Sequence, residues 1–200
     1  MSGIDKMIAT ALSAEIKKEL DSDILKKVER ELFLEQGMSI KLSIEHFDKF
    51  VNVLKKNSNI DVQKFEEKCI EKILKIKKSD EKYLITILDL DLKNLILETF
   101  GEIEARKIIS CLFENEYTIP QILKESKVPK TSGYRKIENL ILNGLIIETG
   151  KILSESKKIS KLQCIFEEIK IDVKKGKISI NGIIDKKIFE KSTSMKFLFE

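Results

Sequence analysis

The chain has only two prolines, both in a short region that starts and stops helices, and this region constrains the fold more than any other feature. Thr118, Pro120 and Gln121 form a capping box with proline in the first turn, which predicts a short helix from Ile119 to Ser126. Val128 precedes the second proline and therefore favours extended backbone, so the chain turns there. A longer helix follows from about Lys130 to Leu142, and Asn143-Gly144 ends it.

The longer helix has one apolar face and one cationic face. The apolar face holds Gly133, Ile137, Leu140 and Ile141. The opposite face holds Lys130, Thr131, Tyr134 and Arg135, with Ser132 and Lys136 at its edges. Its cations lie towards the N-terminal end of the helix. Lys and Arg side chains neutralise phosphates or read guanine edges, and hydroxyls donate to phosphate oxygens, so this face is suited to contact nucleic acid.

Two helices are expected before this pair, over Asn94–Phe100 and Glu102–Phe113, because Gly101 separates two apolar-periodic segments. After the pair we expect a strand over Leu145–Glu148, a polar excursion over Gly150–Leu162 and a returning strand over Cys164–Val173. A turn at residues 174–176 leads into a further strand, Lys177–Ile184. This order of elements is typical of a winged helix-turn-helix, whose third helix enters the major groove of DNA.

The formal net charge of +4 hides an uneven distribution along the chain. Residues 81–117 hold four basic and eight acidic side chains, a net of −4, whereas residues 118–163 hold nine basic and four acidic ones, a net of +5. Between Lys127 and Lys136 there are four cations and no anion. A charge run alone usually marks a solvated face, but this one coincides with the longer helix and the polar excursion.

The first 80 residues are predicted to form a small helical bundle. Gly37 ends its second helix, Ser43 caps the third and Asp61 caps the fourth, whose apolar stripe includes Cys69 and Ile76. His46 is interpreted as a surface or packing residue. Residues 79–92 fit either a short strand or the start of a helix, and we place the domain boundary there.

These observations predict a mainly α fold with a small β-wing. The domains expected are a helical accessory bundle over residues 1–80, a linker over 81–91, a winged helix-turn-helix over 92–172, and a C-terminal strand and tail over 173–200.

Four segments resemble the winged-helix domains of archaeal transcription regulators of the arsenic-repressor-like class: Ala105–Ile109, Ile119–Ile122, Val128–Ile137 and Leu140–Ile146. The most specific part is the motif Pro-Lys-Thr-Ser-x-Tyr-Arg-Lys-Ile from Pro129, followed by Leu-x-x-x-Gly-Leu-Ile from Leu140. The resemblance covers roughly residues 92–172 and implies duplex DNA as the partner. It places Lys130, Thr131, Ser132, Tyr134 and Arg135 at DNA-facing positions and Lys151, Lys157, Lys158 and Lys161 on the wing. With Lys127 and Lys136 of the same cationic run, these residues form the predicted DNA-binding set.

Two departures from that class are informative. Metal-sensing members carry paired cysteines or sets of His and carboxylates, whereas Cys111 and Cys164 are solitary here, so no metal or cofactor is expected and Cys111 is predicted to be buried. Gly133 replaces a small apolar residue, which a close helix crossing would explain at a cost of roughly 1 kcal/mol in helix propensity.

Residues 8–77 are similar, at the level of pattern, to small helical output or accessory domains attached to regulators in ammonia-oxidising archaea. The matching features are the segment Glu31–Gly37 and the helices Phe47–Leu54 and Phe65–Leu74. The similarity implies a regulator that pairs an N-terminal helical module with a DNA-binding domain. It does not decide between a protein partner and a small ligand for that module.

Composition argues against several other classes. No apolar run approaches the roughly 20 residues that span a bilayer, so we expect a cytoplasmic protein without membrane contact. Three distant cysteines favour reduced thiols, and a single histidine leaves little for a Ser/His/Asp or Cys/His pair. Asp89 and Asp91 are interpreted as residues that cap or end an element rather than as a pair that shares a proton, and an enzyme is not expected.

The leading hypothesis is therefore a transcriptional regulator that binds double-stranded DNA, by analogy as a homodimer. Candidate dimer contacts are the helix Asn94–Phe100, the strand that ends at Ile184 and the tail from Lys186 to Glu200. The alternative is a winged-helix module that binds other proteins without sequence-specific DNA binding, because a fold alone does not determine function.

Overall fold

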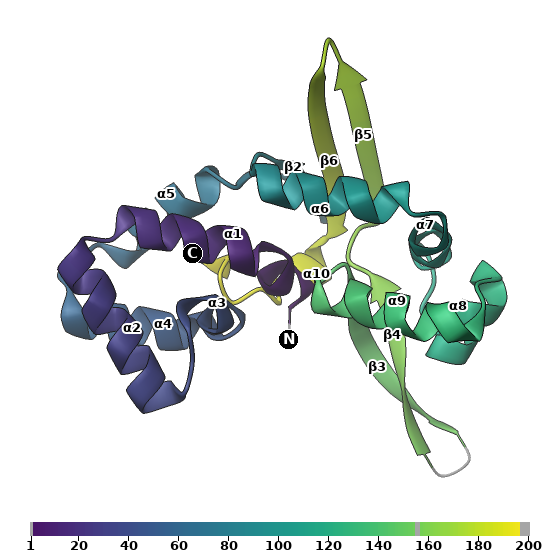
Figure 1. Ribbon diagram of the computed structural model, residues 1–200, viewed down its shortest axis with the longest axis horizontal. Helices are drawn as coiled ribbons and strands as arrows, with labels where there is room; N and C mark the ends of the chain where they lie inside the picture. Colours follow the sequence, from purple (N-terminus) through teal and green to yellow (C-terminus); the bar gives the residue numbers. More distant parts are fainter. Residues whose placement is uncertain (1, 155–156, 197–200) are drawn as a thin grey trace.

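The structure is a computed structural model that describes residues 2–154 and 157–196 (Figure 1). Helices lie at both ends of an elongated molecule, and two β-hairpins project from it in opposite directions (Figure 1). Buried apolar side chains form one cluster that extends from the first helix to Met195. The chain is therefore a mixed α and β protein with a continuous core.

The N-terminal part is helical, as the sequence predicts. Its helices are α1 (Gly3–Glu19), α2 (Ser22–Gln36), α3 (Ile40–Ser43), the 3-10 turn η1 (Ile44–His46), α4 (Phe47–Asn57) and α5 (Val62–Glu71). Gly37 ends α2 in the left-handed conformation, and the Asp61 carboxylate accepts from the Lys64 N–H, so both predicted signals are confirmed.

Ser43 differs from the prediction. Its hydroxyl is buried and donates to the carbonyl of Ile40, while Ser39 caps α3 and the next long helix begins only at Phe47. A serine can cap a helix, or its hydroxyl can donate to a carbonyl of the preceding turn. Ser43 does the second, because Ile40 and Ile44 beside it are buried in the core.

A four-stranded antiparallel sheet is the main difference from the predicted fold class. Its strands are β1 (Leu74–Ser79), β2 (Lys82–Ile87), β6 (Lys177–Asp185) and β5 (Glu168–Lys174), in the order β1-β2-β6-β5. The fourth helix thus ends before Ile76, which lies in β1, and the ambiguous stretch 79–92 contains a strand. The strand predicted over Lys177–Ile184 is confirmed as β6, but the predicted fold class of mainly α structure with a small wing did not include a four-stranded sheet.

Pairing with a distant segment explains the difference. Ile85 of β2 lies opposite Gly182 of β6, about a hundred residues later, and the alternating Tyr83, Ile85 and Ile87 are all buried. A strand of six residues is stabilised by its neighbours across the sheet, and local periodicity does not report such neighbours.

The second half contains α6 (Leu90–Gly101), α7 (Ile103–Ser110), α8 (Ile119–Ser126) and α9 (Lys130–Leu142), followed by β3 (Ile146–Ser154) and β4 (Lys157–Cys164). The bounds predicted for the helices at 119–126 and 130–142 are confirmed, and Thr118 and Gln121 make the predicted capping box. The returning strand is β4, which ends at Cys164, whereas residues 168–174 belong to the other sheet. Tyr117 forms an antiparallel bridge with Leu162, so the segment between α7 and α8 joins the β3–β4 hairpin.

The C-terminal tail packs into its own chain. The short helix α10 (Lys186–Phe189) places the Phe189 ring on Tyr83, with 4.1 Å between ring centroids. Beyond it, the buried Asp5 carboxylate accepts hydrogen bonds from the hydroxyls of Ser192, Thr193 and Ser194 at 2.5, 3.1 and 2.6 Å. The part of the tail offered as a dimer contact is thus occupied within one chain up to residue 196, and residues 197–200 lie outside the described residues.

The first turn of α1 also touches the end of α9. Gly144 has a φ of 73°, and a Cβ built on it would lie 2.3 Å from the Gly3 carbonyl oxygen; a Cβ on Gly3 would lie 2.8 Å from the Gly144 oxygen. Two backbones approach here closely enough that only glycine fits on either side.

Replacing Gly144 by Ala tests this contact. We expect Gly144→Ala to lower the free energy of unfolding by about 3 kcal/mol or more, because a positive φ costs about 1–2 kcal/mol and the clash adds to it. Gly37→Ala is the matched control, since Gly37 has a φ of 63° but nothing within 4 Å of its Cβ position. Urea unfolding that gives equal losses for the two variants would contradict the close approach.

Removing the buried carboxylate tests the attachment of the tail. We expect Asp5→Ala to cost about 3 kcal/mol, because several charge-assisted hydrogen bonds are lost and buried hydroxyls are left without an acceptor. Asp48→Ala removes an exposed carboxylate that pairs with Lys196 at 3.3 Å, and we expect it to cost less than about 1 kcal/mol. A similar loss for both in thermal or urea unfolding would show that the Asp5 contacts are not stabilising.

Candidate nucleic-acid interface

The turn between α8 and α9 is set by three residues. Lys127 ends α8 with a φ of 55°, Val128 is buried and Pro129 precedes the first turn of α9. The two helices cross closely, since a Cβ on Gly133 would lie 2.2 Å from Leu123 Cδ2. The close crossing predicted from Gly133 is confirmed, and it holds α9 in one orientation against α8.

The outward face of α9 carries the predicted side chains. Lys130, Thr131, Arg135 and Tyr134 are exposed, whereas Ser132 is half-buried and its hydroxyl donates to the Pro129 carbonyl at 3.4 Å. Gly133, Ile137 and Leu140 are buried on the opposite face, as the periodicity predicts.

The cations of this face differ in whether an acid already neutralises them. Within residues 2–154 and 157–196, no carboxylate lies within ion-pair distance of Lys127, Lys130 or Arg135. Lys136 instead points inward, where it pairs with Glu102 and, at 3.5 Å, with Glu104 at the start of α7. Its side chain is only 12% exposed, and the hydrogen bond to Glu102 raises the pKa of the Lys136 ammonium. Lys136 therefore fastens α9 to α7 rather than extending the free cationic face.

The start of α9 adds backbone donors to this face. No side chain caps the helix at Pro129. The first N–H groups of a helix lack partners within it and carry partial positive charge, so they favour an anion. They lie next to Lys130 and Thr131, at the same end as the free cations.

Two lysines of the β3–β4 hairpin, Lys151 and Lys158, lie on one face, whereas Lys161 lies on the other. Lys151 lies opposite Ser160, and Leu153 lies opposite Lys158, so these four side chains share a face of the hairpin. Lys158 is exposed, and Lys151 lies 3.5 Å from Glu148. Lys161 pairs with Glu116 at 3.6 Å, nearer the base of the hairpin. The side chain of Lys157 lies outside the described residues.

Leu153 is a surface residue that the sequence analysis missed. It is 74% exposed on the face that holds Lys151 and Lys158. Residues 150–162 were interpreted as polar because lysine and serine dominate them, although Ile152, Leu153 and Ile159 are apolar. The cross-strand register shows that this exposed apolar side chain lies beside the two lysines, which the sequence without the strand pairing does not show.

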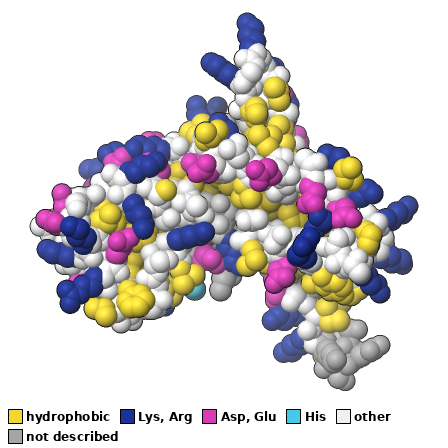
Figure 2. All heavy atoms as spheres, in the orientation of Figure 1, with side chains coloured by type: hydrophobic (Ala, Val, Ile, Leu, Met, Phe, Trp, Pro, Cys, Tyr) yellow, Lys and Arg dark blue, Asp and Glu magenta, His cyan; other side chains and the backbone are white. Residues whose placement is uncertain are grey.

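Dark-blue side chains surround the end of the molecule that holds α8 and α9, with acidic side chains beside them (Figure 2). Two of the acids near α9, Glu102 and Glu104, pair with Lys136 rather than with Lys130 or Arg135. A surface of this kind attracts phosphate most strongly at low ionic strength.

The cysteines do not form a metal or redox site in the described part of the chain. Burial raises the pKa of the Cys69 and Cys164 thiols to about 12. Cys111 is half-buried rather than buried as predicted, and its thiol donates to the Ile108 carbonyl at 3.1 Å. Within residues 2–154 and 157–196, no three His, Cys, Asp or Glu side chains are grouped as metal ligands.

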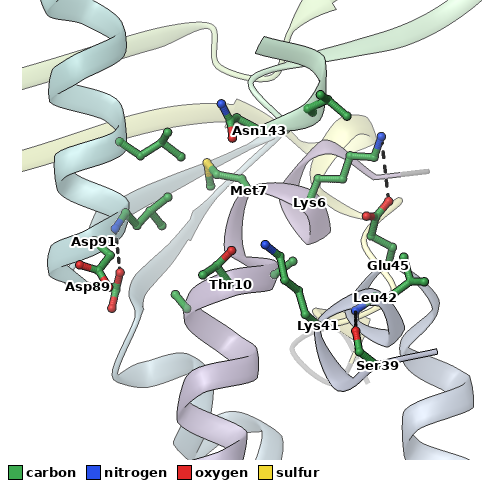
Figure 3. Close-up of a pocket in the computed structure, with 15 residues that line it drawn as sticks. Lys6, Met7, Thr10, Ser39, Lys41, Leu42, Glu45, Asp89, Asp91 and Asn143 are labelled. Atoms are coloured by element: carbon green, nitrogen blue, oxygen red, sulfur yellow. Dashed lines mark hydrogen bonds and ion pairs between the residues drawn. The ribbon is translucent and has the colours of Figure 1, made fainter. Parts of the chain in front are cut away.

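A pocket of about 380 Å³ opens between α1, α3, α6 and the end of α9 (Figure 3). Its charged groups mostly have partners: Lys6 lies 4.0 Å from Glu45, and the Asp89 carboxylate accepts from the Leu92 N–H at 2.8 Å. Asp89 therefore caps α6, as predicted, and its neighbour Asp91 is exposed in the first turn of that helix. His46, half-buried at the end of η1, does not line this pocket.

Comparisons with known proteins identify no relative of this chain. No protein-family model matches the chain, and no similar protein is found among curated proteins or solved structures. Across the part of the chain that the structure describes, none of the helices combines the length and hydropathy needed to cross a bilayer.

The thiols offer a test of the burial around this interface. In native protein at pH 8, we expect a thiol reagent to modify Cys111 first, because a pKa of about 12 leaves only about one in ten thousand of the Cys69 and Cys164 thiols ionised. Mass spectrometry after partial labelling identifies the site, with unfolded protein as the control in which all three react. Rapid labelling of Cys164 in native protein would contradict the burial of β4.

Proposed function

We propose that the chain is a DNA-binding transcriptional regulator in which residues 92–172 act as a winged helix-turn-helix. The observation that carries the proposal is the cationic face of α9, whose Lys130 and Arg135 have no carboxylate partner among the described residues. This face precedes a hairpin on which Lys151 and Lys158 share one face. In this proposal α9 enters the major groove, and the β3–β4 hairpin lies along the adjacent backbone.

The element order supports this assignment. α7, the bridged segment at Tyr117, α8, α9 and the β3–β4 hairpin follow one another as in a winged helix. α8 buries Ile122 and Leu123 against the core, which leaves α9 as the helix that presents a polar face to a partner.

Each side chain has a distinct part in the proposal. Lys127, Lys130, Lys151 and Lys158 contact phosphates and provide affinity without sequence preference. Arg135 and Tyr134, further along α9, face the base edges and provide specificity, since Arg pairs with guanine in a bidentate manner. Thr131, Ser132 and the free N–H groups of the first turn donate to a phosphate. Lys136 and Lys161 hold α9 and β4 in place through their ion pairs.

A homodimer would present two such faces to two half-sites one helical turn apart, about 34 Å. The N-terminal helices and the pocket of Figure 3 are then free to receive a partner or a small ligand, and that pocket touches the end of α9 at Asn143. No metal or cofactor takes part in the proposal.

The double variant Lys130→Ala, Arg135→Ala tests the proposal. We expect at least a tenfold loss of affinity for duplex DNA and a decrease of about 0.9 in the salt slope, because Lys130 is the one phosphate contact that the variant removes. Fluorescence anisotropy with a labelled duplex at several salt concentrations measures both quantities.

Lys27→Ala, Arg30→Ala is the matched control, because it removes one Lys and one Arg from the exposed side of α2. It should leave the affinity within about twofold, which general electrostatics allows for a distant charge. If the control loses as much affinity as the α9 variant, binding is unspecific and the assignment of the face is wrong.

A protein-interaction module is the second candidate function, and two exposed side chains favour it. Ile103 at the start of α7 is 61% exposed, and Leu142 at the end of α9 is 65% exposed. Unchanged DNA binding in the α9 variant, together with loss of a stable protein partner in Leu142→Ser, would favour this function over the first.

A further inference from the structure

The β5–β6 hairpin extends beyond the sheet that anchors it. Ile87, the last residue of β2, lies opposite Ile180, so residues 177–179 of β6 pair only with residues 172–174 of β5. Figure 1 shows these ends as an arm that leaves the body on the side opposite the β3–β4 hairpin. We refer to residues 172–179 as the arm.

The arm has a tight two-residue turn. Lys174 pairs with Lys177, and the loop between them is Lys175-Gly176, with φ values of 48° and 75°. Two positive φ values in succession are typical of a type I′ turn, which matches the twist of paired strands. The tip is therefore held in one shape although it projects from the body.

The cations of the arm lack acidic partners. Lys174, Lys175 and Lys177 are exposed, and no carboxylate of the described residues lies within ion-pair distance of them. Lys170, nearer the body, pairs with Asp172 at 3.7 Å. Lys68 of α5 and Lys72, which follows that helix, differ from the lysines at the tip because both pair with Glu19. Figure 2 shows the dark-blue side chains at the end of the arm.

An apolar pair lies directly below these lysines. Val173 faces Ile178 across the two strands, and they are 68% and 38% exposed. Yellow side chains continue from this pair down the arm in Figure 2. Three cations at the tip and an exposed apolar pair behind them are the composition of a β-ribbon that enters a DNA groove, where lysines meet phosphates and apolar side chains meet bases and sugars.

We infer that the arm is a second contact for duplex nucleic acid, and that the chain bridges two duplex segments. A two-stranded ribbon has the width that a major groove admits. Because the arm and the wing project in opposite directions, they reach different segments (Figure 1). The inference rests on the proposed function for the contact at α9. The contact at the arm is argued independently, from residues 172–179.

A bridging assay tests the inference. One random-sequence duplex is fixed to beads, and capture of a second, fluorescent duplex is measured with and without protein at low salt. The variant Lys174→Gln, Lys175→Asn, Lys177→Gln removes the three cations and leaves an Asn-Gly pair that favours the same turn. We expect it to lose at least tenfold in capture of the second duplex, while its binding to the fixed duplex changes less than threefold.

Lys26→Gln, Lys27→Gln, Lys55→Gln is the control, because it removes three exposed lysines from α2 and α4. It should bridge as well as the native protein. Equal bridging by the arm variant would overturn the inference, and so would equal losses in the arm variant and the control. A lower sedimentation coefficient of the arm variant without DNA would assign the arm to contact with a second copy instead.

The α9 variant separates this inference from the proposed function. If Lys130→Ala, Arg135→Ala binds the fixed duplex normally and the arm variant does not, the arm is the main DNA contact and the proposed role of α9 fails. If both variants bind one duplex and neither bridges, each contact holds one segment as inferred.

Discussion

The contacts of the first turn of α1 hold the C-terminal tail and the end of α9 in place. Asp5 accepts hydrogen bonds from the C-terminal tail, and two residues earlier Gly3 meets the backbone of Gly144 at the end of α9. Burying a carboxylate is costly unless hydrogen bonds replace those to water, and here the tail provides them. One turn of helix thus joins both ends of the chain to the helix proposed to contact DNA.

Charge pairing divides the lysines of this chain into two groups. Lys68, Lys72 and Lys136 lie beside glutamates and contribute to packing or to the position of a helix. Lys130, at the start of α9, and the lysines of the arm face solvent without a described partner. Since an exposed ion pair has little net energy, its main effect here is on which cations are available to an anionic partner. Exposed lysines without a described ion pair also lie elsewhere, as Lys26 does on α2, so the proposed contacts depend in addition on the polar face of α9 and on the projection of the arm.

Prediction from sequence succeeded where the signal was local. The capping box at Thr118, the turn at Pro129 and the stop at Asn143-Gly144 act over a few residues, and α8 and α9 have the predicted bounds. The apolar and cationic faces of α9 followed from helical periodicity. The sheet was missed because β1 and β2 are stabilised by β6, about a hundred residues away, and Ile76 suits a helix stripe as well as a strand.

The sequence by itself determined the helices of the second half, the polarity of α9 and the basic character of the two hairpins, because caps, turns and periodicity are properties of neighbouring residues. Only the tertiary structure decided which lysines are free, since the partners of Lys136 lie at Glu102 and Glu104, more than thirty residues away. It also decided that the β5–β6 hairpin projects as an arm, because that depends on where the shorter β2 ends against β6.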